Sequence, residues 1–273
     1  MHLLSYNLYG VLNSNITDAP SWHDRLCILQ KHIPYLLDKY DIDVAFFQEV
    51  NEYNMDMLKG AINGYYMLKL FPMTTNEGGL QYNVTVIKNS LKEAVTQVNC
   101  EPHGFDSDYL PPEKQRIDYG MSDYRTTVFT HLCLNNKKYI LGNTHTDYIS
   151  VEGKILGIRK SLDYIKNRKH EKGDFDFALV FGDMNMVAHM AEVHQILRNR
   201  PDFTTCHISK VNGICLNSYH GYGSQESVNV DFAFVPSINS AQYKWECIVN
   251  GDGRDDGSDH YPVMLTINDG INA

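Results

Sequence analysis

Carboxylate, amide and imidazole side chains border apolar segments at six places in this chain of 273 residues. The apolar segments have the composition of buried strands, where a carboxylate is costly unless it is paired or bound to a metal. A single Asp at a strand end is more often a loop cap than a ligand. If the strands share one edge, however, these positions form a cluster. They are Asn7, Glu49, His145 with Asp147, Asp183 with Asn185, Asp231, and Asp259 with His260.

The chemistry of this set favours a hard cation. Oxygen ligands, amides and two imidazoles suit Mg²⁺ or Mn²⁺ together with a phosphate group. The six cysteines are scattered and form no CxxC pair, so they predict neither a zinc site nor a disulfide framework. We therefore expect Mg²⁺ (or Mn²⁺) as the cofactor and free thiols in a reducing compartment.

Apolar periodicity predicts the elements that position these residues. Helical spacing of apolar residues predicts helices over 22–40, 153–168 and 186–197. Short segments rich in β-branched and aromatic residues predict strands between the helices. The predicted strands are 3–8, 42–47, 65–70, 82–87, 126–134, 139–144, 177–181, 230–235 and 262–267.

The arrangement of these elements predicts the fold class. Back-to-back strands 126–134 and 139–144, joined by Asn135-Asn136, are typical of an antiparallel hairpin. An α/β sandwich with mixed, mainly antiparallel pairing therefore fits better than a purely parallel sheet. Residues 100–123 lack periodicity and predict a long surface loop. No repeat or linker interrupts the chain, so we expect one domain over 1–273.

The ordered motifs resemble a known superfamily. Ser5-Tyr6-Asn7, Gln48-Glu49, Asn143-Thr144-His145, Gly182-Asp183-Met184-Asn185, Val230-Asp231-Phe232 and Ser258-Asp259-His260 have the order and rough spacing seen in the endonuclease/exonuclease/phosphatase superfamily. Any one motif is common by chance, whereas the ordered set is specific. The resemblance implies the deoxyribonuclease I-like fold, in which two sheets pack as a sandwich flanked by helices. Residues 143–147 and 218–223 are similar to segments of a bacterial branch of metal-dependent hydrolases.

The resemblance also implies roles for the site residues. Asn7, Glu49 and Asp259 would hold the divalent cation, with Glu49 as the principal carboxylate ligand. For Asn7, a turn at the strand end is an equal alternative, since Asn favours such turns.

The remaining implied roles concern the reaction itself. Asp183 would orient and deprotonate the attacking water, and Asn185 would help to hold the phosphoryl group. His145 and His260 would flank the phosphate, and Asp231 would orient His260. We find no carboxylate partner for His145 in the sequence.

Arg125, Asp147 and His220 are candidate substrate-binding residues. Each has a structural alternative: Arg125 could pair with an acidic neighbour, and Asp147 and His220 could support the pocket without touching substrate.

The predicted function is a divalent-metal-dependent phosphoesterase, which hydrolyses phosphodiester or phosphomonoester bonds by in-line attack of an Asp-activated water. Members of the superfamily cleave DNA, RNA, phosphotyrosyl-DNA links, inositol phosphates and sphingomyelin. The substrate could thus be a nucleic acid, a small molecule or a lipid headgroup, and a nuclease proper or a sphingomyelinase-like or inositol-phosphatase-like enzyme are alternatives. A non-catalytic binding module is disfavoured, because Glu49, Asp183 and His260 are intact.

The net charge of the chain favours one class of substrate over another. Lys and Arg total 24 against 33 Asp and Glu, a net charge of −9. Nucleic-acid binding draws on cationic surface, so we expect compact substrates to be preferred over long duplex DNA. No apolar run approaches the ~20 residues of a membrane helix. The opening residues do not predict a signal peptide. We expect a cytoplasmic protein without an evident protein partner; a secreted location stays open, because a mature secreted chain would also lack a signal peptide.

Overall fold

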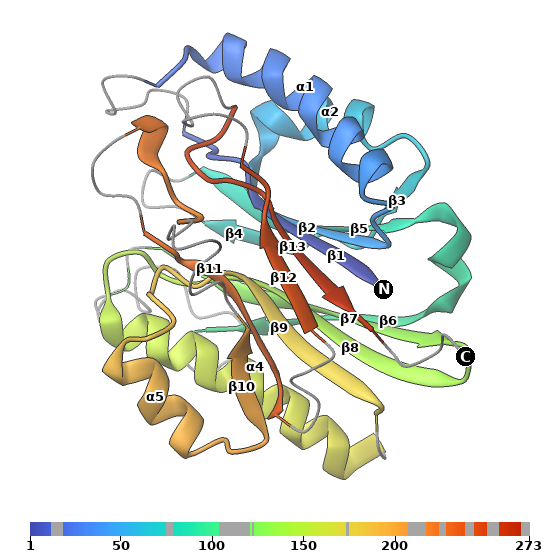
Figure 1. Cartoon of the computed structure of the whole chain (residues 1–273), viewed down its shortest axis with the longest axis vertical. Helices are drawn as coiled ribbons and strands as arrows, with labels where there is room; N and C mark the ends of the chain where they lie inside the picture. The colour runs from blue at the N-terminus through green and yellow to red at the C-terminus, as the bar shows by residue number, and fades with distance from the viewer. Residues whose placement is uncertain are drawn as a thin grey trace.

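The computed structural model consists of two β-sheets packed face to face, with helices on both outer faces (Figure 1). It describes residues 1–11, 19–74, 79–103, 121, 123–172, 175–206, 217–223, 228–237, 243–249 and 257–268. Most of the predicted loop over 100–123 lies outside these residues. Its first three residues continue a strand that reaches Pro102.

The first sheet is built around a parallel pair of strands. Its strands are β1 (His2–Asn7), β2 (Val44–Asn51), β3 (Tyr65–Met67), β4 (Pro72–Thr74), β5 (Leu80–Lys88), β12 (Tyr243–Cys247) and β13 (Val263–Ile267). The order is β12-β13-β1-β2-β5-β3, with β4 also paired to β5. Only β1 and β2 run parallel within this described sheet.

The second sheet repeats this plan. Its strands are β6 (Val95–Pro102), β7 (Thr126–Leu134), β8 (Lys137–His145), β9 (Phe177–Asp183), β10 (Phe203–Cys206) and β11 (Asp231–Pro236). The order is β10-β11-β9-β8-β7-β6, and β8 runs parallel to β9. The predicted hairpin is confirmed: β7 pairs with β8, and Asn135 and Asn136 both have the positive φ that a tight hairpin turn requires.

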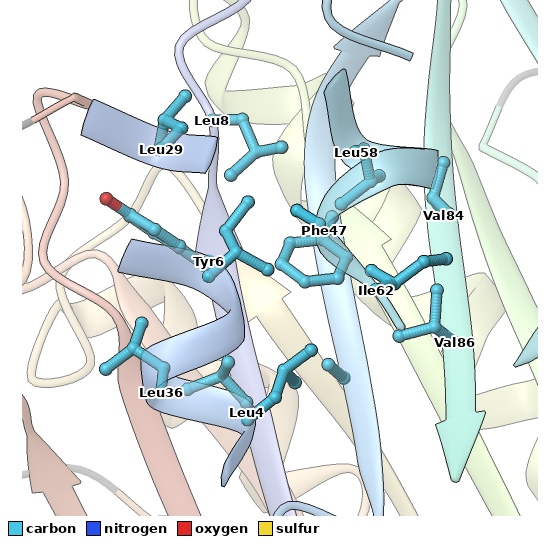
Figure 2. Close-up of a cluster of buried hydrophobic side chains, with 14 of the residues drawn as sticks. Leu4, Tyr6, Leu8, Leu29, Leu36, Phe47, Leu58, Ile62, Val84 and Val86 are labelled. Carbon is cyan, nitrogen blue, oxygen red and sulfur yellow. The ribbon is translucent and has the colours of Figure 1, made fainter. Parts of the chain in front are cut away.

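Helices cover the outer face of each sheet. The helices are α1 (Trp22–Lys39), α2 (Glu52–Ala61), α4 (Val151–Lys172) and α5 (Ala191–Arg198), with short 3-10 turns η1 (Asn89–Ala94) and η2 (Gly221–Gly223). Leu4 and Tyr6 of β1, and Leu8 directly after it, share one apolar cluster with side chains of α1, and Phe47 of β2 belongs to the same cluster next to α2 (Figure 2). A second cluster fills the space between the sheets, and a third lies beneath α4 and α5.

The sandwich class predicted from the sequence is therefore confirmed, although several elements differ from expectation. Helix α2 and strands β4, β6, β10 and β12 were not predicted. Helix α5 begins at Ala191 rather than at residue 186, and α4 is longer than expected at both ends. In the described part of the chain, the five cysteines are free thiols. Within the same residues, no helix combines the length and apolar character needed to cross a membrane.

Candidate active site

Strand alternation carries polar side chains into the space between the sheets at one edge. In β1, Leu3 lies in the core between the sheets, so Asn7, four residues on, faces the same side. In β9, Leu179 and Phe181 lie in that core, and Asp183 ends the strand on the same face. The same strands that build the apolar core thus deliver the site residues.

Strand direction brings the chain-distant residues together. Because β8 and β9 are parallel, His145 and Asp183 are register partners at their carboxyl ends. The antiparallel β11 begins at this edge, where Asp231 pairs in register with Asp183. The Asp259–His260 segment precedes β13, which lies antiparallel to β1. The structure therefore confirms that these strand ends meet at one edge of the sandwich, as the sequence predicts.

Gly182 permits the close approach of β8 and β9 at the site. Its φ is 148°, and a Cβ added there would lie 2.0 Å from the Thr144 carbonyl oxygen. Only glycine fits this contact without a backbone shift.

Glu49 reaches the site through an irregularity in β2. Regular alternation after Phe47 would turn its side chain toward the helices. Instead, the register with β5 shifts between Phe47 and Val50, and Glu49 has a φ of 56°. Such a bulge re-aims the side chain. As a result, Glu49 Oε1 accepts a hydrogen bond from Asn7 Nδ2 at 3.1 Å, and Oε2 accepts one from the Gly10 N–H at 2.9 Å.

Asp183 is the central buried carboxylate of the site. Its Oδ2 accepts from Asn7 Nδ2 at 3.0 Å, and its Oδ1 accepts from the Asn185 N–H at 2.8 Å. Burial and the neighbouring Asp231 raise its pKa to about 6, against the opposing effects of His260 and these hydrogen bonds. An acidic group with this pKa is largely ionised at neutral pH and is a competent general base.

His260 is held as a cation. Its Nδ1 lies 2.8 Å from Asp231 Oδ2, which is the contact that the resemblance implies for an orienting carboxylate. Burial alone would lower the pKa of His260, but Asp231, Asp259 and Asp183 together raise it well above the usual value. The Nε2–H of this imidazolium lies 3.7 Å from Asp183 Oδ2.

At its Nδ1, His145 has a guanidinium as its partner instead of a carboxylate. Arg125 Nη1 lies 2.8 Å from His145 Nδ1, and Arg125 Nη2 donates to Asp123 Oδ2 at 2.8 Å. A guanidinium can only donate, so Nδ1 accepts and the imidazole proton sits on Nε2. Burial and Arg125 lower the pKa of His145 well below its usual value. Its Nε2–H lies 3.5 Å from Asp183 Oδ2. The pairing of Arg125 with an acidic neighbour, the structural alternative, is also present.

Asp259 presents a buried oxygen with no hydrogen-bond donor. Its Oδ1 accepts no hydrogen bond from the described residues and lies 3.9 Å from His260 Nε2. Burial raises the pKa of Asp259 to about 7, and Glu49 adds to the rise against the opposing effect of His260. Two carboxylates that repel each other, one of them with a buried oxygen that accepts no hydrogen bond from the described residues, are a suitable donor set for a hard cation.

A second group of candidate metal ligands includes Asp183 itself. Ligand atoms of Asp183, Asp231 and His260 lie within 4.8 Å of one another. A cation held there would compete with the proton that joins His260 to Asp231. A cation held by the Glu49 and Asp259 carboxylates would not compete with that proton. The Asn7 oxygen already accepts from the Tyr9 N–H at 2.9 Å, so Asn7 as a ligand stays a prediction.

The remaining candidates lie around this centre with structural contacts. Asp147 is fully buried and caps the turn before α4, where its Oδ1 accepts from the N–H groups of Ile149 and Ser150. His220 is buried, its N–H donates to the Asp259 carbonyl at 2.9 Å, and its ring lies 4.2 Å from that of Tyr261. These contacts match the alternative in which both residues support the pocket.

Asn185 is partly buried at the edge of the site. Besides its N–H bond to Asp183, its Nδ2 donates to the Thr146 carbonyl at 3.0 Å. It has a φ of 48°, which Asn tolerates better than most residues.

The sequence did not single out three residues that support the site. Asp123 holds Arg125 from two positions away, a spacing that could have been noticed. Lys154 faces Asp147 and Asp183, whose charges oppose the lowering of its pKa by burial. Arg25 is buried in α1 with no motif to reveal it.

Known structures share this architecture. No protein-family profile matches the chain, and no curated protein matches it in sequence. The match to an endonuclease/exonuclease/phosphatase from Bacteroides vulgatus has a TM-score of 0.73 at 17% identity and covers 97% of this chain and 98% of that one. The human Nocturnin catalytic domain, with bound sulfate, matches with a TM-score of 0.69 at 11% identity, over 97% and 93% of the two chains.

A phosphatase shows the same likeness. The mannosyl-6-phosphatase of Bacteroides thetaiotaomicron matches with a TM-score of 0.64 at 15% identity, over 98% of this chain and 99% of that one. The chain therefore has the endonuclease/exonuclease/phosphatase fold, and the resemblance carried by the six motifs is confirmed at the level of the fold.

Proposed function

We propose that the protein is a divalent-metal-dependent hydrolase of phosphoester bonds. One observation carries the proposal: the buried carboxylate of Asp183 lies between the Nε2 atoms of His145 and His260, at 3.5 and 3.7 Å. One imidazole is neutral and the other is a cation, so two N–H donors and one base converge on a single point. Groups whose environments push their pKa values apart are typical of acid–base sites.

Asp183 acts as the base for a water molecule in this proposal. Its carboxylate is held by Asn7 and by the Asn185 N–H, which fix its direction. Positioning of this kind is what phosphoryl transfer chiefly requires of a protein.

The imidazoles receive the negative charge that develops on the phosphoryl oxygens and the leaving group. His145 donates from Nε2, since Arg125 occupies its other nitrogen. His260 donates from Nε2 as a cation and can release that proton to a departing oxygen, while Asp231 stabilises the charge. Donors fixed in a buried site act more strongly than they would in water.

Glu49 and Asp259 would hold the divalent cation, with Asn7 next to them. A bound Mg²⁺ or Mn²⁺ supplies charge neutralisation at the phosphoryl group. The buried Oδ1 of Asp259, to which none of the described residues donates a hydrogen bond, supports this assignment.

Compact phosphate esters are the substrates we propose. A relative in fold is a mannosyl-6-phosphatase, and another binds sulfate, a tetrahedral anion like phosphate. The net charge of −9 opposes a long polyanion.

The test is kcat/KM for supercoiled plasmid, short single-stranded oligonucleotides, bis-p-nitrophenyl phosphate and sugar phosphates at matched ionic strength. We expect the small esters or the short ends to be turned over better than plasmid. Efficient plasmid nicking that falls steeply with salt would make the protein an ordinary endonuclease. No turnover of any ester with Mg²⁺ or Mn²⁺ would overturn the proposal.

A further inference from the structure

A buried arginine outside the reacting groups sits behind the proposed cation ligands. Arg25 in α1 is 1% exposed, and the rings of Tyr9 and Trp22 lie 4.7 and 5.0 Å from its guanidinium carbon. No carboxylate among the described residues forms an ion pair with it. Burying a charged guanidinium is costly unless hydrogen bonds offset the cost, so the groups that Arg25 contacts indicate its role.

The guanidinium of Arg25 binds the segment that contacts Glu49. Arg25 Nη1 donates to the Tyr9 carbonyl at 2.9 Å, and Nη2 donates to the Val11 carbonyl. Between these carbonyls lies Gly10, whose N–H donates to Glu49 Oε2 at 2.9 Å.

Gly10 is also held tightly from the other side. The Asn51 amide donates to the Gly10 carbonyl, and a Cβ at Gly10 would lie 2.3 Å from the Glu49 carbonyl oxygen. The guanidinium therefore fixes the backbone that fixes the Glu49 carboxylate.

The stacked guanidinium also connects to the segments that hold Asp259. The Tyr9 ring on which it stacks lies 5.8 Å from the ring of Tyr222, and the Tyr222 N–H donates to His220 Nδ1 at 3.1 Å. Tyr222 has a φ of 55° and follows the His220–Gly221 pair, whose N–H groups donate to the Asp259 carbonyl at 2.9 and 3.1 Å.

Helix α1 also packs directly on the Asp259 loop. A Cβ at Gly257 would lie 2.9 Å from the Arg25 carbonyl oxygen. Arg25 thus contacts the backbone that holds Glu49 directly, and it reaches the supports of Asp259 through the Tyr9 ring and the backbone of α1.

We propose that Arg25 is a positioning residue that fixes the Glu49 and Asp259 carboxylates relative to each other and so prepares them for a divalent cation. The inference rests on the proposed function for the presence of that cation. A lysine cannot replace Arg25, because a single ammonium cannot span two carbonyls while it stacks between two rings.

The experiment is direct Mn²⁺ binding to the full chain without substrate, by calorimetry or electron paramagnetic resonance. We expect Arg25→Lys and Arg25→Met to weaken Mn²⁺ binding by about tenfold or more, as losses behind metal ligands do. With saturating Mn²⁺, kcat should change less than the Mn²⁺ affinity does.

Two control variants separate positioning from general stability. Arg200→Lys alters an arginine paired with Asp163 at α4, away from the site, and should bind Mn²⁺ like the wild type. Ile165→Val lowers stability in the core beneath α4 and should also leave the affinity unchanged. Arg25→Lys keeps the test open if Arg25→Met fails to fold, because it retains the positive charge and loses the paired bonds to the Tyr9 and Val11 carbonyls.

The outcomes distinguish this inference from the proposed function. If the wild type binds Mn²⁺ and Arg25→Lys binds it equally well, the inference is overturned and the cation site stands. If the wild type itself binds no Mn²⁺, the cation site and this inference both fall.

Discussion

His103 makes the stability of the protein depend on pH in a way that can be calculated. The side chain is fully buried, and burial with the nearby charges of Arg125 and Lys160 lowers its pKa from 6.5 to about 3. Its Nε2 lies 2.8 Å from Thr127 Oγ1. Its Nδ1 accepts no hydrogen bond from the described residues and lies against Gly157. A proton on Nδ1 would therefore find no acceptor among these residues.

The sign follows from the two states. On acidification below the unfolded-state pKa of 6.5, the unfolded chain takes up a proton that folded His103 refuses, so stability falls from there down to a pH of about 3. At about pH 5 the loss from this one group is about 2 kcal/mol relative to neutral pH, at ~1.4 kcal/mol per pKa unit. The raised pKa values of Asp183 and Asp259 act in the opposite direction.

The comparison with His103→Gln isolates this contribution. A Gln amide can still donate to Thr127 but takes up no proton. Urea unfolding at about pH 7.5 and about pH 5, in chelator so that no cation adds linkage, should show a pH-dependent loss about 2 kcal/mol smaller in the variant. Equal pH dependence in the two proteins would refute the assignment of a neutral buried His103.

Two further predictions concern charge and packing at the site. Asp231→Asn removes a carboxylate that raises the His260 pKa, so the alkaline limb of the pH–rate profile should move to lower pH; an unmoved limb would make Asp231 purely structural. Gly182→Ala should lower the free energy of unfolding by about 3 kcal/mol or more, since its Cβ meets the Thr144 carbonyl. Gly60→Ala in α2 meets nothing and should raise that free energy by about 0.5–1 kcal/mol; equal effects in urea unfolding would contradict this.

The sequence could predict the site edge because its signals are local. A short apolar segment with a polar residue at its end is enough to indicate β9 and Asp183. The same holds for β1 and Asn7. Helix α2 was missed because Asn51, Asn54 and Gly60 dilute its apolar pattern, although Asn51 forms a capping box with Asn54.

Other features depend on contacts that local pattern does not encode. The orientation of Glu49 needs the bulge in β2, which only the register with β5 reveals. The partner of His145 Nδ1 is Arg125 and not a carboxylate, so the imidazole lies next to a positive charge instead of a negative one. The role of Arg25 requires α1 to be packed against the Tyr9–Val11 segment, which lies 14 to 16 residues before Arg25 in the chain.

We propose that the protein hydrolyses phosphoesters with a divalent cation and with Asp183 as the base. The most direct measurement is the initial rate on bis-p-nitrophenyl phosphate and p-nitrophenyl phosphate in EDTA and after addition of Mg²⁺ or Mn²⁺. We expect no turnover in EDTA, recovery with either cation, and a rate lower by about 10²–10⁴ for folded Asp183→Asn. Full turnover in EDTA, or a near-normal kcat for Asp183→Asn, would contradict it.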